Sequence, residues 1–229
     1  MGFDRECPRA PARTLTEGVT VKSVLERTLE LTSGMPRRGK WPDALTLVAL
    51  AALMLLATLP ATAQTPDAYA LLRQPGHAAF LRHAATSGGY GDPPGYRLEE
   101  CATQRPLVDA GRAQARRTRA ALAANGIAFD RVLTSPWCRC RETAALVTGR
   151  EAEVMQALAN LVGRTEHRDA QVTALKAYLA GLEGARALFV THGIVISALV
   201  GLNPAEGEMA IVKIGAGGVA TVVGRLKVE

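Results

Sequence analysis

Two short apolar runs in this sequence each lead into a histidine. The run at 77–82 ends at His83, and the run at 187–190 ends two residues before His192. Short apolar runs that alternate with stretches of helical periodicity predict buried strands joined by helices. Histidines that follow such strands lie at the edge of the sheet, where open α/β folds bind their ligands. The two runs therefore predict an α/β fold with a ligand site at one sheet edge.

The same alternation continues to the end of the chain. We expect strands at 77–82, 131–133, 153–155 and 187–190, helices at 109–125, 143–147, 169–182 and 194–200, and a hairpin of 209–214 with 219–223. The apolar positions of the first long helix are Ala113, Ala120, Leu122 and Ala123. This order predicts a three-layer α/β/α sandwich whose central sheet is mostly parallel and has an antiparallel edge.

Arginines accompany both histidines. Arg82 directly precedes His83, and Arg139 lies just beyond the Ser135-Pro136 break that ends a third apolar run. A guanidinium group pairs with two phosphate oxygens at once, so two arginines and two histidines at one sheet edge predict a pocket for a phosphoryl dianion. We expect Arg105 at the substrate entrance, with an ordinary solvated loop position as the alternative.

His83 has the surroundings of a nucleophile. A neutral imidazole attacks phosphorus in line and holds the phosphoryl group as phosphohistidine until water removes it. The transition state spreads negative charge over the equatorial oxygens, which fixed positive charges and hydrogen-bond donors stabilise. The groups expected to provide them are Arg82, Arg139 and His192, together with the hydroxyls of Thr86 and Ser135.

The positive charge of the chain does not indicate a nucleic-acid binder. There are 27 Lys and Arg residues against 21 Asp and Glu residues, a net charge of +6. Arg116, Arg117 and Arg119 gather on one predicted helix, but no aromatic side chains lie among them to stack on bases. Such a cluster is typical of a solvated helix face, so we expect no nucleic-acid partner.

The N-terminal region has the pattern of a secretory signal peptide. Arg37, Arg38 and Lys40 precede the apolar run 44–59, and Ala61-Thr62-Ala63 provides small residues at a cleavage site. These are the three parts of a signal peptide, which we assign to 35–63. A membrane anchor is the alternative, but the run is shorter than the roughly 20 residues that span a bilayer. We therefore expect no stable membrane insertion after cleavage.

Met35 stands where a signal peptide of ordinary length would begin. We interpret residues 1–34 as an over-extended, disordered N-terminus, and 64–229 as one mature domain. Export places that domain in the periplasm or outside the cell, in an oxidising compartment where disulfides persist.

Three cysteines remain in the mature domain after Cys7 is removed. A C-x-C pair can bind a metal, but no further Cys or His lies nearby in the sequence to complete a site. We expect a disulfide from Cys101 to Cys138 or Cys140, which would tie the loop after His83 to the segment that contains Arg139. One thiol then stays free, and the sequence leaves open which one.

Three segments resemble the signatures of a known family. They are RHAAT at 82–86, SPWCRCRETA at 135–144 and THG at 191–193, with an L-x-x-x-G-x-x-Q-A helix start at 107–115. Together they resemble the histidine phosphatase superfamily, which has the phosphoglycerate mutase-like fold, and suggest a small, exported member of bacterial type. The resemblance implies that His83 accepts the phosphoryl group and that Arg82, Arg139 and His192 complete the phosphate pocket.

The sequence departs from the family pattern at two places. Ala84 stands where the family usually has glycine, and Asn160 stands where mutase-type members have a glutamate that acts as general acid. Gly193 excludes the branch with an aspartate directly after the second histidine. We expect either Glu166 or Asp169 to serve as the acid, or none to be needed because the leaving group is a weak base.

These observations predict an exported phosphomonoesterase that acts on small phosphorylated substrates through a phosphohistidine on His83, with no metal and no other cofactor. Two alternatives remain. One is a non-catalytic module of the same fold that binds a phosphorylated ligand, and the other is a protein-phosphohistidine phosphatase. The sequence leaves the natural substrate and the oligomeric state open.

Overall fold

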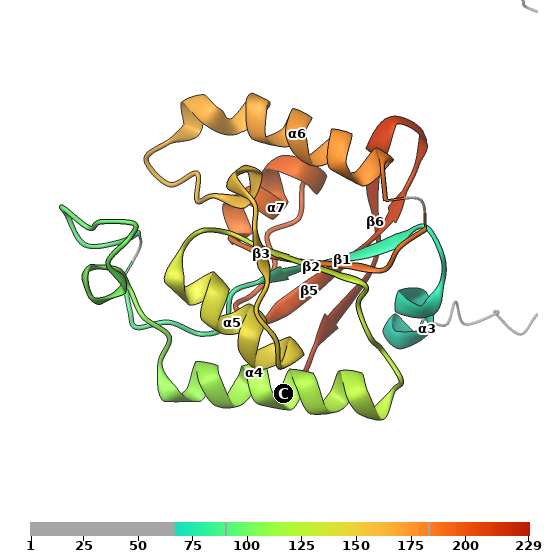
Figure 1. The fold of residues 1–229 in the computed structure, drawn as a ribbon, viewed down its shortest axis with the longest axis horizontal. Helices are drawn as coiled ribbons and strands as arrows, with labels where there is room; N and C mark the ends of the chain where they lie inside the picture. The colour runs from blue at the N-terminus through green and yellow to red at the C-terminus, as the bar shows by residue number, and fades with distance from the viewer. Residues whose placement is uncertain (1–66, 90, 183) are drawn as a thin grey trace, which may run out of the picture. The chain divides into compact units, whose positions relative to one another are not determined.

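The computed structural model describes residues 67–229, apart from residues 90 and 183 (Figure 1). The expected N-terminal extension at 1–34 and signal peptide at 35–63 lie outside the described residues. The domain that follows is built around one sheet.

The sheet has six strands in the order β3-β2-β4-β1-β5-β6. The first four pair in parallel, whereas β5 and β6 are antiparallel. This confirms the expected mostly parallel sheet with an antiparallel edge. The strands are β1 (His77–Arg82), β2 (Arg131–Thr134), β3 (Glu153–Val154), β4 (Ala187–Thr191), β5 (Glu208–Ile214) and β6 (Ala220–Lys227).

Helices cover both faces of the sheet (Figure 1). They are α3 (Ala68–Arg73), α4 (Asp109–Ala124), α5 (Cys138–Thr148), α6 (Arg168–Ala180) and α7 (Gly193–Val200). The short helix α3 was not expected from the sequence. Four 3₁₀ turns complete the structure, at η1 (Cys101–Thr103), η2 (Gln156–Leu158), η3 (Thr165–His167) and η4 (Ala216–Gly218).

The core is divided into two layers by the alternation of side chains along the strands. In β1, Ala79 and Leu81 belong to the layer that holds α4 and α5, whereas Ala78 and Phe80 belong to the layer under α6. Successive strand residues point to opposite faces, so a strand that is apolar throughout is covered on both sides. The expected three-layer α/β/α sandwich is therefore confirmed.

The buried face of α4 differs from the one expected. Its buried positions are Gly111, Ala115, Thr118 and Leu122. Of the four expected apolar positions only Leu122 is buried, because this helix packs through small residues. A Cβ atom at Gly111 would lie 2.1 Å from the carbonyl oxygen of Ala85, so the helix approaches the loop after β1 backbone to backbone.

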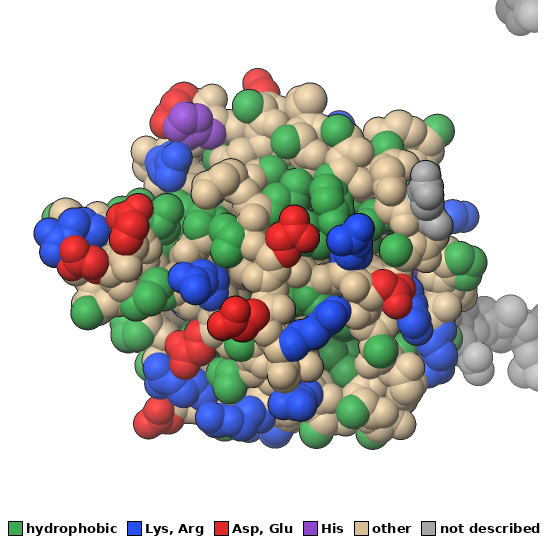
Figure 2. All heavy atoms as spheres, in the orientation of Figure 1, with side chains coloured by type: hydrophobic (Ala, Val, Ile, Leu, Met, Phe, Trp, Pro, Cys, Tyr) green, Lys and Arg blue, Asp and Glu red, His purple; other side chains and the backbone are tan. Residues whose placement is uncertain are grey.

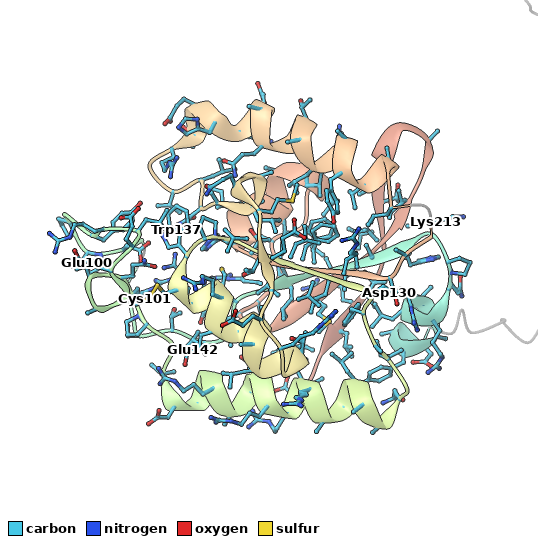
Figure 3. The ribbon with its side chains drawn as sticks, viewed as in Figure 1. Glu100, Cys101, Asp130, Trp137, Glu142 and Lys213 are labelled. Atoms are coloured by element: carbon cyan, nitrogen blue, oxygen red, sulfur yellow. A yellow bond between two sulfur atoms is a disulfide. The ribbon has the colours of Figure 1, made fainter. Side chains whose placement is uncertain are left out.

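Helix α5 begins five residues earlier than expected and includes Arg139 in its first turn. The polar stretch at its start has no apolar periodicity, which explains why the sequence pattern missed it. A disulfide joins Cys101, labelled in Figure 3, to Cys138 at this end of the helix. Cys140 is free and buried. The expected bridge is confirmed, and the structure selects Cys138 as the partner.

Charged side chains of both signs are interspersed on the face drawn in Figure 2. The arginines at 116, 117 and 119 are exposed on α4, as expected for a solvated helix face. Within residues 67–89, 91–182 and 184–229, no helix has the length and apolar character needed to cross a membrane.

Candidate active site

The register of two parallel strands brings both predicted histidines together. Arg82 at the end of β1 pairs with Thr191 at the end of β4, and the amide of His83 donates to the Thr191 carbonyl at 2.9 Å. His83 and His192 each follow a paired position, so they emerge side by side from the sheet edge. Their rings lie edge to face with centroids 5.4 Å apart.

His83 is held with one ring nitrogen engaged. Its Nδ1 lies 2.9 Å from the Ala84 carbonyl oxygen, which can only accept, so Nδ1 bears the proton and Nε2 retains its lone pair. Burial lowers the pKa of His83 to about 3, and the nearby guanidinium groups of Arg139, Arg82 and Arg105 also lower it. The ring is therefore neutral and fixed in the tautomer that leaves Nε2 nucleophilic.

His192 is held through both ring nitrogens. Its Nε2 lies 2.9 Å from the Ser135 hydroxyl, and its Nδ1 lies 3.5 Å from a terminal nitrogen of Arg139. A guanidinium group only donates, so Nδ1 is the acceptor and Nε2 donates to Ser135. Burial lowers the pKa of His192 well below its ordinary value, as do His83 and the neighbouring arginines. Ser135 is buried and contacts His192, but it does not line the cleft described below.

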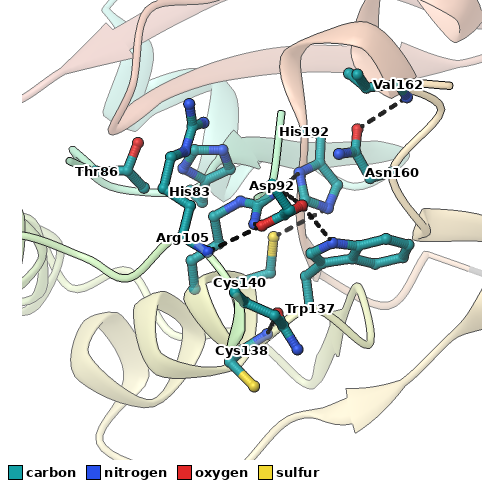
Figure 4. A network of polar contacts seen from close by, with 12 residues as sticks. His83, Thr86, Asp92, Arg105, Trp137, Cys138, Cys140, Asn160, Val162 and His192 are labelled. Atoms are coloured by element: carbon teal, nitrogen blue, oxygen red, sulfur yellow. Dashed lines mark hydrogen bonds and ion pairs between the residues drawn. The ribbon is translucent and has the colours of Figure 1, made fainter. Parts of the chain in front are cut away.

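Arg139 is bound by a carboxylate that the sequence did not indicate. Asp92 accepts from both terminal nitrogens of Arg139, at 2.6 and 3.2 Å, and the two side chains are 1% and 2% exposed. Asp92 also accepts from the indole of Trp137 at 2.9 Å and from the amide of Arg105 at 3.0 Å (Figure 4). Burial raises the pKa of Asp92, but these hydrogen bonds outweigh burial and lower it overall.

A cleft of about 490 Å³ opens beside the two histidines. Of the residues expected at the site, it is lined by Arg82, His83, Thr86, Arg105, Arg139 and His192. The Nε atoms of all three arginines are buried and have no hydrogen-bond partner among the described residues. Three guanidinium groups thus converge on the cleft, which suits a ligand with several anionic oxygens.

Ala84, which replaces the usual glycine, does not narrow this cleft. Its side chain is 1% exposed and packs in the core layer that holds α4 and α5. Its amide donates to the hydroxyl of Thr143 at 3.0 Å, and that hydroxyl donates to the Arg139 carbonyl at 2.7 Å. Thr143 thus connects the loop after His83 to the helix that presents Arg139.

The L-x-x-x-G-x-x-Q-A segment supports the same loop. Besides the close approach at Gly111, the side chain of Gln114 accepts from the Ala85 amide at 3.3 Å and donates to the Glu206 carbonyl at 3.1 Å. The amide of Gly207 donates to the His83 carbonyl at 3.0 Å. The motif therefore joins the nucleophile loop to the segment before β5.

Glu206 is a second residue at the site that sequence reasoning missed. Its carboxylate lines the cleft and accepts from the Thr86 hydroxyl at 2.8 Å. By contrast, the acids proposed from the sequence, Glu166 and Asp169, are exposed and do not line the cleft. Asn160 does line it, and its side-chain oxygen accepts from the amide of Val162 (Figure 4). No motif or periodicity in the sequence marks Glu206.

The other two histidines of the described residues lie apart from the site. His77 begins β1, where its Nδ1 bonds the Pro75 carbonyl at 3.0 Å, and His167 is exposed beside Glu166. In the described part of the chain, no group of three or more His, Cys, Asp or Glu side chains is arranged to hold a metal ion.

Comparison with protein families gives one match. Residues 79–164 match the model of the histidine phosphatase superfamily (branch 1). The matched range contains the segments at 82–86 and 135–144 and thus confirms the resemblance to that superfamily. Comparison with curated proteins gives no match.

Comparison with solved structures gives further matches, among them three phosphatases. The protein histidine phosphatase SixA complexed with tungstate is 20% identical, with 66% of this chain and 96% of that chain covered and a TM-score of 0.48. The α-ribazole phosphatase of Shigella flexneri is 19% identical, with coverages of 64% and 94% and a TM-score of 0.48. The phosphoserine phosphatase of Entamoeba histolytica is 15% identical, with coverages of 67% and 98% and a TM-score of 0.45.

Proposed function

We propose that this chain, whose residues 79–164 match the histidine phosphatase superfamily, is an exported phosphomonoesterase that hydrolyses phosphate esters through a covalent phosphohistidine on His83. One observation supports this function above the others. Nδ1 of His83 is occupied by the Ala84 carbonyl, so the neutral ring can present only Nε2 to a cleft rich in guanidinium groups.

In the proposed reaction, Nε2 of His83 attacks the phosphorus atom while the ester oxygen leaves. Arg82 and Arg139 hold the equatorial oxygens, whose negative charge grows in the transition state. His192 joins them when its Nε2–H, which donates to the Ser135 hydroxyl in the free protein, turns to a phosphoryl oxygen. Arg139 is held in place by Asp92, which accepts from both of its terminal nitrogens. The site is thus preorganised for charge stabilisation, which requires no reorganisation at the moment of reaction.

The remaining predicted site residues have two kinds of role in this proposal. Arg105 and Thr86 line the cleft and would contact substrate, which we take to be a small phosphorylated molecule that fits a cleft of about 490 Å³. Ser135 is a positioning residue, because its hydroxyl bonds Nε2 of His192 and thereby fixes the tautomer of that ring.

Export is part of the proposal and rests on the signal-peptide pattern at 35–63. The disulfide between Cys101 and Cys138 is consistent with it, since structural disulfides persist in oxidising compartments. Cell fractionation with N-terminal sequencing tests this directly. We expect a precursor that begins at Met35 and a mature periplasmic or secreted form that begins at Gln64. A cytoplasmic protein of full length would contradict export.

Activity is tested on p-nitrophenyl phosphate with the purified protein in the presence of a chelator. We expect turnover that resists chelation, and ³²P-labelled phosphoenzyme in rapidly quenched samples. His83→Ala should abolish both signals, whereas His167→Ala, at an exposed position, should change neither. If the protein binds phosphate or vanadate but gives no turnover and no phosphoenzyme, it is a phospho-ligand-binding module instead.

A further inference from the structure

We propose that Glu206 is the general acid and base of this site, an inference that rests on the proposed phosphatase function. The sequence offered Glu166 and Asp169 for this role, and both are exposed away from the cleft. Among the described residues that line the cleft, Glu206 is the single carboxylate. Asp92 is close by, but both of its oxygens are bound to Arg139.

The Glu206 carboxylate is held among the groups expected to bind the phosphoryl group. Its Oε1 accepts from the Thr86 hydroxyl at 2.8 Å and lies 3.8 Å from Arg82 and 4.0 Å from Arg105. The same oxygen lies 3.9 Å from Nδ1 of His83. These distances place the carboxylate beside the imidazole ring of His83, and the Glu206 side chain is still 27% exposed.

The backbone around Glu206 is fixed on three sides. Gln114 donates to the Glu206 carbonyl, Arg82 donates to the carbonyl of Pro204 at 3.0 Å, and the amide of Gly207 donates to the His83 carbonyl. At Gly207 the backbone has φ +74°, and a Cβ atom there would meet the Gln114 side chain at 2.3 Å. These contacts therefore fix the backbone position of Glu206 beside the cleft.

The proposed reaction balances in two steps. In the first, the lone pair of His83 Nε2 forms the N–P bond, the P–O bond to the leaving group breaks, and the leaving oxygen takes the proton of Glu206. In the second, the Glu206 carboxylate takes a proton from water as the water oxygen forms a bond to phosphorus. The N–P bond breaks, its electron pair returns to Nε2, and phosphate leaves.

The test compares leaving groups of different basicity. p-Nitrophenolate is a weak base and leaves without a proton, whereas the alkoxide of β-glycerophosphate needs one. We measure kcat/KM, which reports the steps through phosphoenzyme formation, for the wild-type protein and Glu206→Gln. We expect a loss of about 100-fold or more on β-glycerophosphate and of less than about 3-fold on p-nitrophenyl phosphate. Because the second step still needs the base, the variant should accumulate phosphoenzyme on the aryl ester.

The matched control is Glu166→Gln, an exposed glutamate outside the cleft that should leave both esters unaffected. A second variant, Glu206→Ala, tests chemistry apart from folding, because added formate should restore alkyl-ester hydrolysis if only a carboxyl group is missing.

Each outcome decides between the two proposals. An equal loss on both esters without formate rescue would make Glu206 a structural counter-ion, and no loss on either would exclude any role. A wild-type protein that hydrolyses only the aryl ester has no working acid, which also overturns the inference. Absence of turnover on both esters by the wild-type protein would instead overturn the proposed function.

Discussion

Asp92 binds the guanidinium group of Arg139 through both carboxylate oxygens, although 47 positions separate the two residues in the chain. The bound residue is the one expected to hold the phosphoryl group. The Gly- and Pro-rich loop that contains Asp92 is therefore part of the site, and its carboxylate orients Arg139 while leaving the Nε of that arginine unpaired.

Replacement of Asp92 should lower both the stability and the activity of the protein. Asp92→Asn removes one charge of a buried pair and leaves the Arg139 cation uncompensated, which is expected to destabilise the protein by about 3 kcal/mol. The variant should also lose kcat/KM, because Arg139 is no longer oriented. Urea unfolding and the phosphatase assay measure the two effects. Asp130→Asn, which weakens an exposed pair with Arg186, should change little; an equally small effect at Asp92 would contradict the assigned role.

The free energy of unfolding should depend on pH because His83 is buried and neutral in the native protein. Burial lowers the pKa of His83 to about 3, whereas an unfolded histidine has a value near 6.5. Between these values the unfolded state binds more protons than the native state, so stability falls as the pH drops below about 6.5. At pH 4.5 the loss from this group is roughly 2–3 kcal/mol. Denaturation of the wild-type protein and His83→Gln at pH 4.5 and 7.5 checks this, because the variant should show a smaller difference.

The same pKa makes a prediction for catalysis. Because His83 is neutral in the free protein throughout pH 5–8, protonation of the nucleophile should give the kcat/KM profile no acidic limb near pH 6.5. A half-maximal point at pH 6.5, shifted upward by Arg105→Gln, would show that the nucleophile titrates with an ordinary value.

The disulfide should stabilise the loop over the site. It closes a separation of 37 residues, for which the chain-entropy model gives roughly 3–4 kcal/mol. We expect Cys101→Ser to lower the urea midpoint by a corresponding amount, and reductant to have the same effect on the wild-type protein but none on the variant.

Cys140 should resist alkylation until the protein unfolds, because burial raises the pKa of its thiol to about 12. Peptide mass spectrometry distinguishes the three cysteines.

Gly111→Ala should destabilise the protein although alanine is the better helix former. The added methyl group would lie 2.1 Å from the Ala85 carbonyl oxygen and push on the loop after His83. We expect a loss of about 2 kcal/mol together with reduced phosphoenzyme formation. The comparison variant is Gly181→Ala, where the nearest atom would be 3.7 Å away and little change is expected. A neutral or stabilising effect at Gly111 would show that the loop yields without consequence.

Much of the architecture could be predicted because its signals are local. The apolar runs marked β1 and β4 to within a residue, and a strand that ends before a histidine defines a sheet edge. The start of α5 was predicted too late because it lies within a polar stretch. The buried face of α4 was predicted wrongly because this helix packs mainly through glycine, alanine and threonine. The start of α5 and the buried face of α4 both depend on contacts with neighbouring elements, and such contacts leave no periodic signal in the sequence.

The fold class, the two histidines and the arginines that accompany them could be predicted from the order of residues in the chain. Three contacts became visible in the folded protein alone: Asp92 binds Arg139, Cys138 rather than Cys140 pairs with Cys101, and Glu206 accepts from the Thr86 hydroxyl across 120 positions. Strand and helix patterns arise from neighbours a few residues apart, so they are legible in the chain. Contacts between distant loops depend on how those elements pack. The positions of Glu206 and Asp92 and the partner of Cys101 therefore follow from that packing.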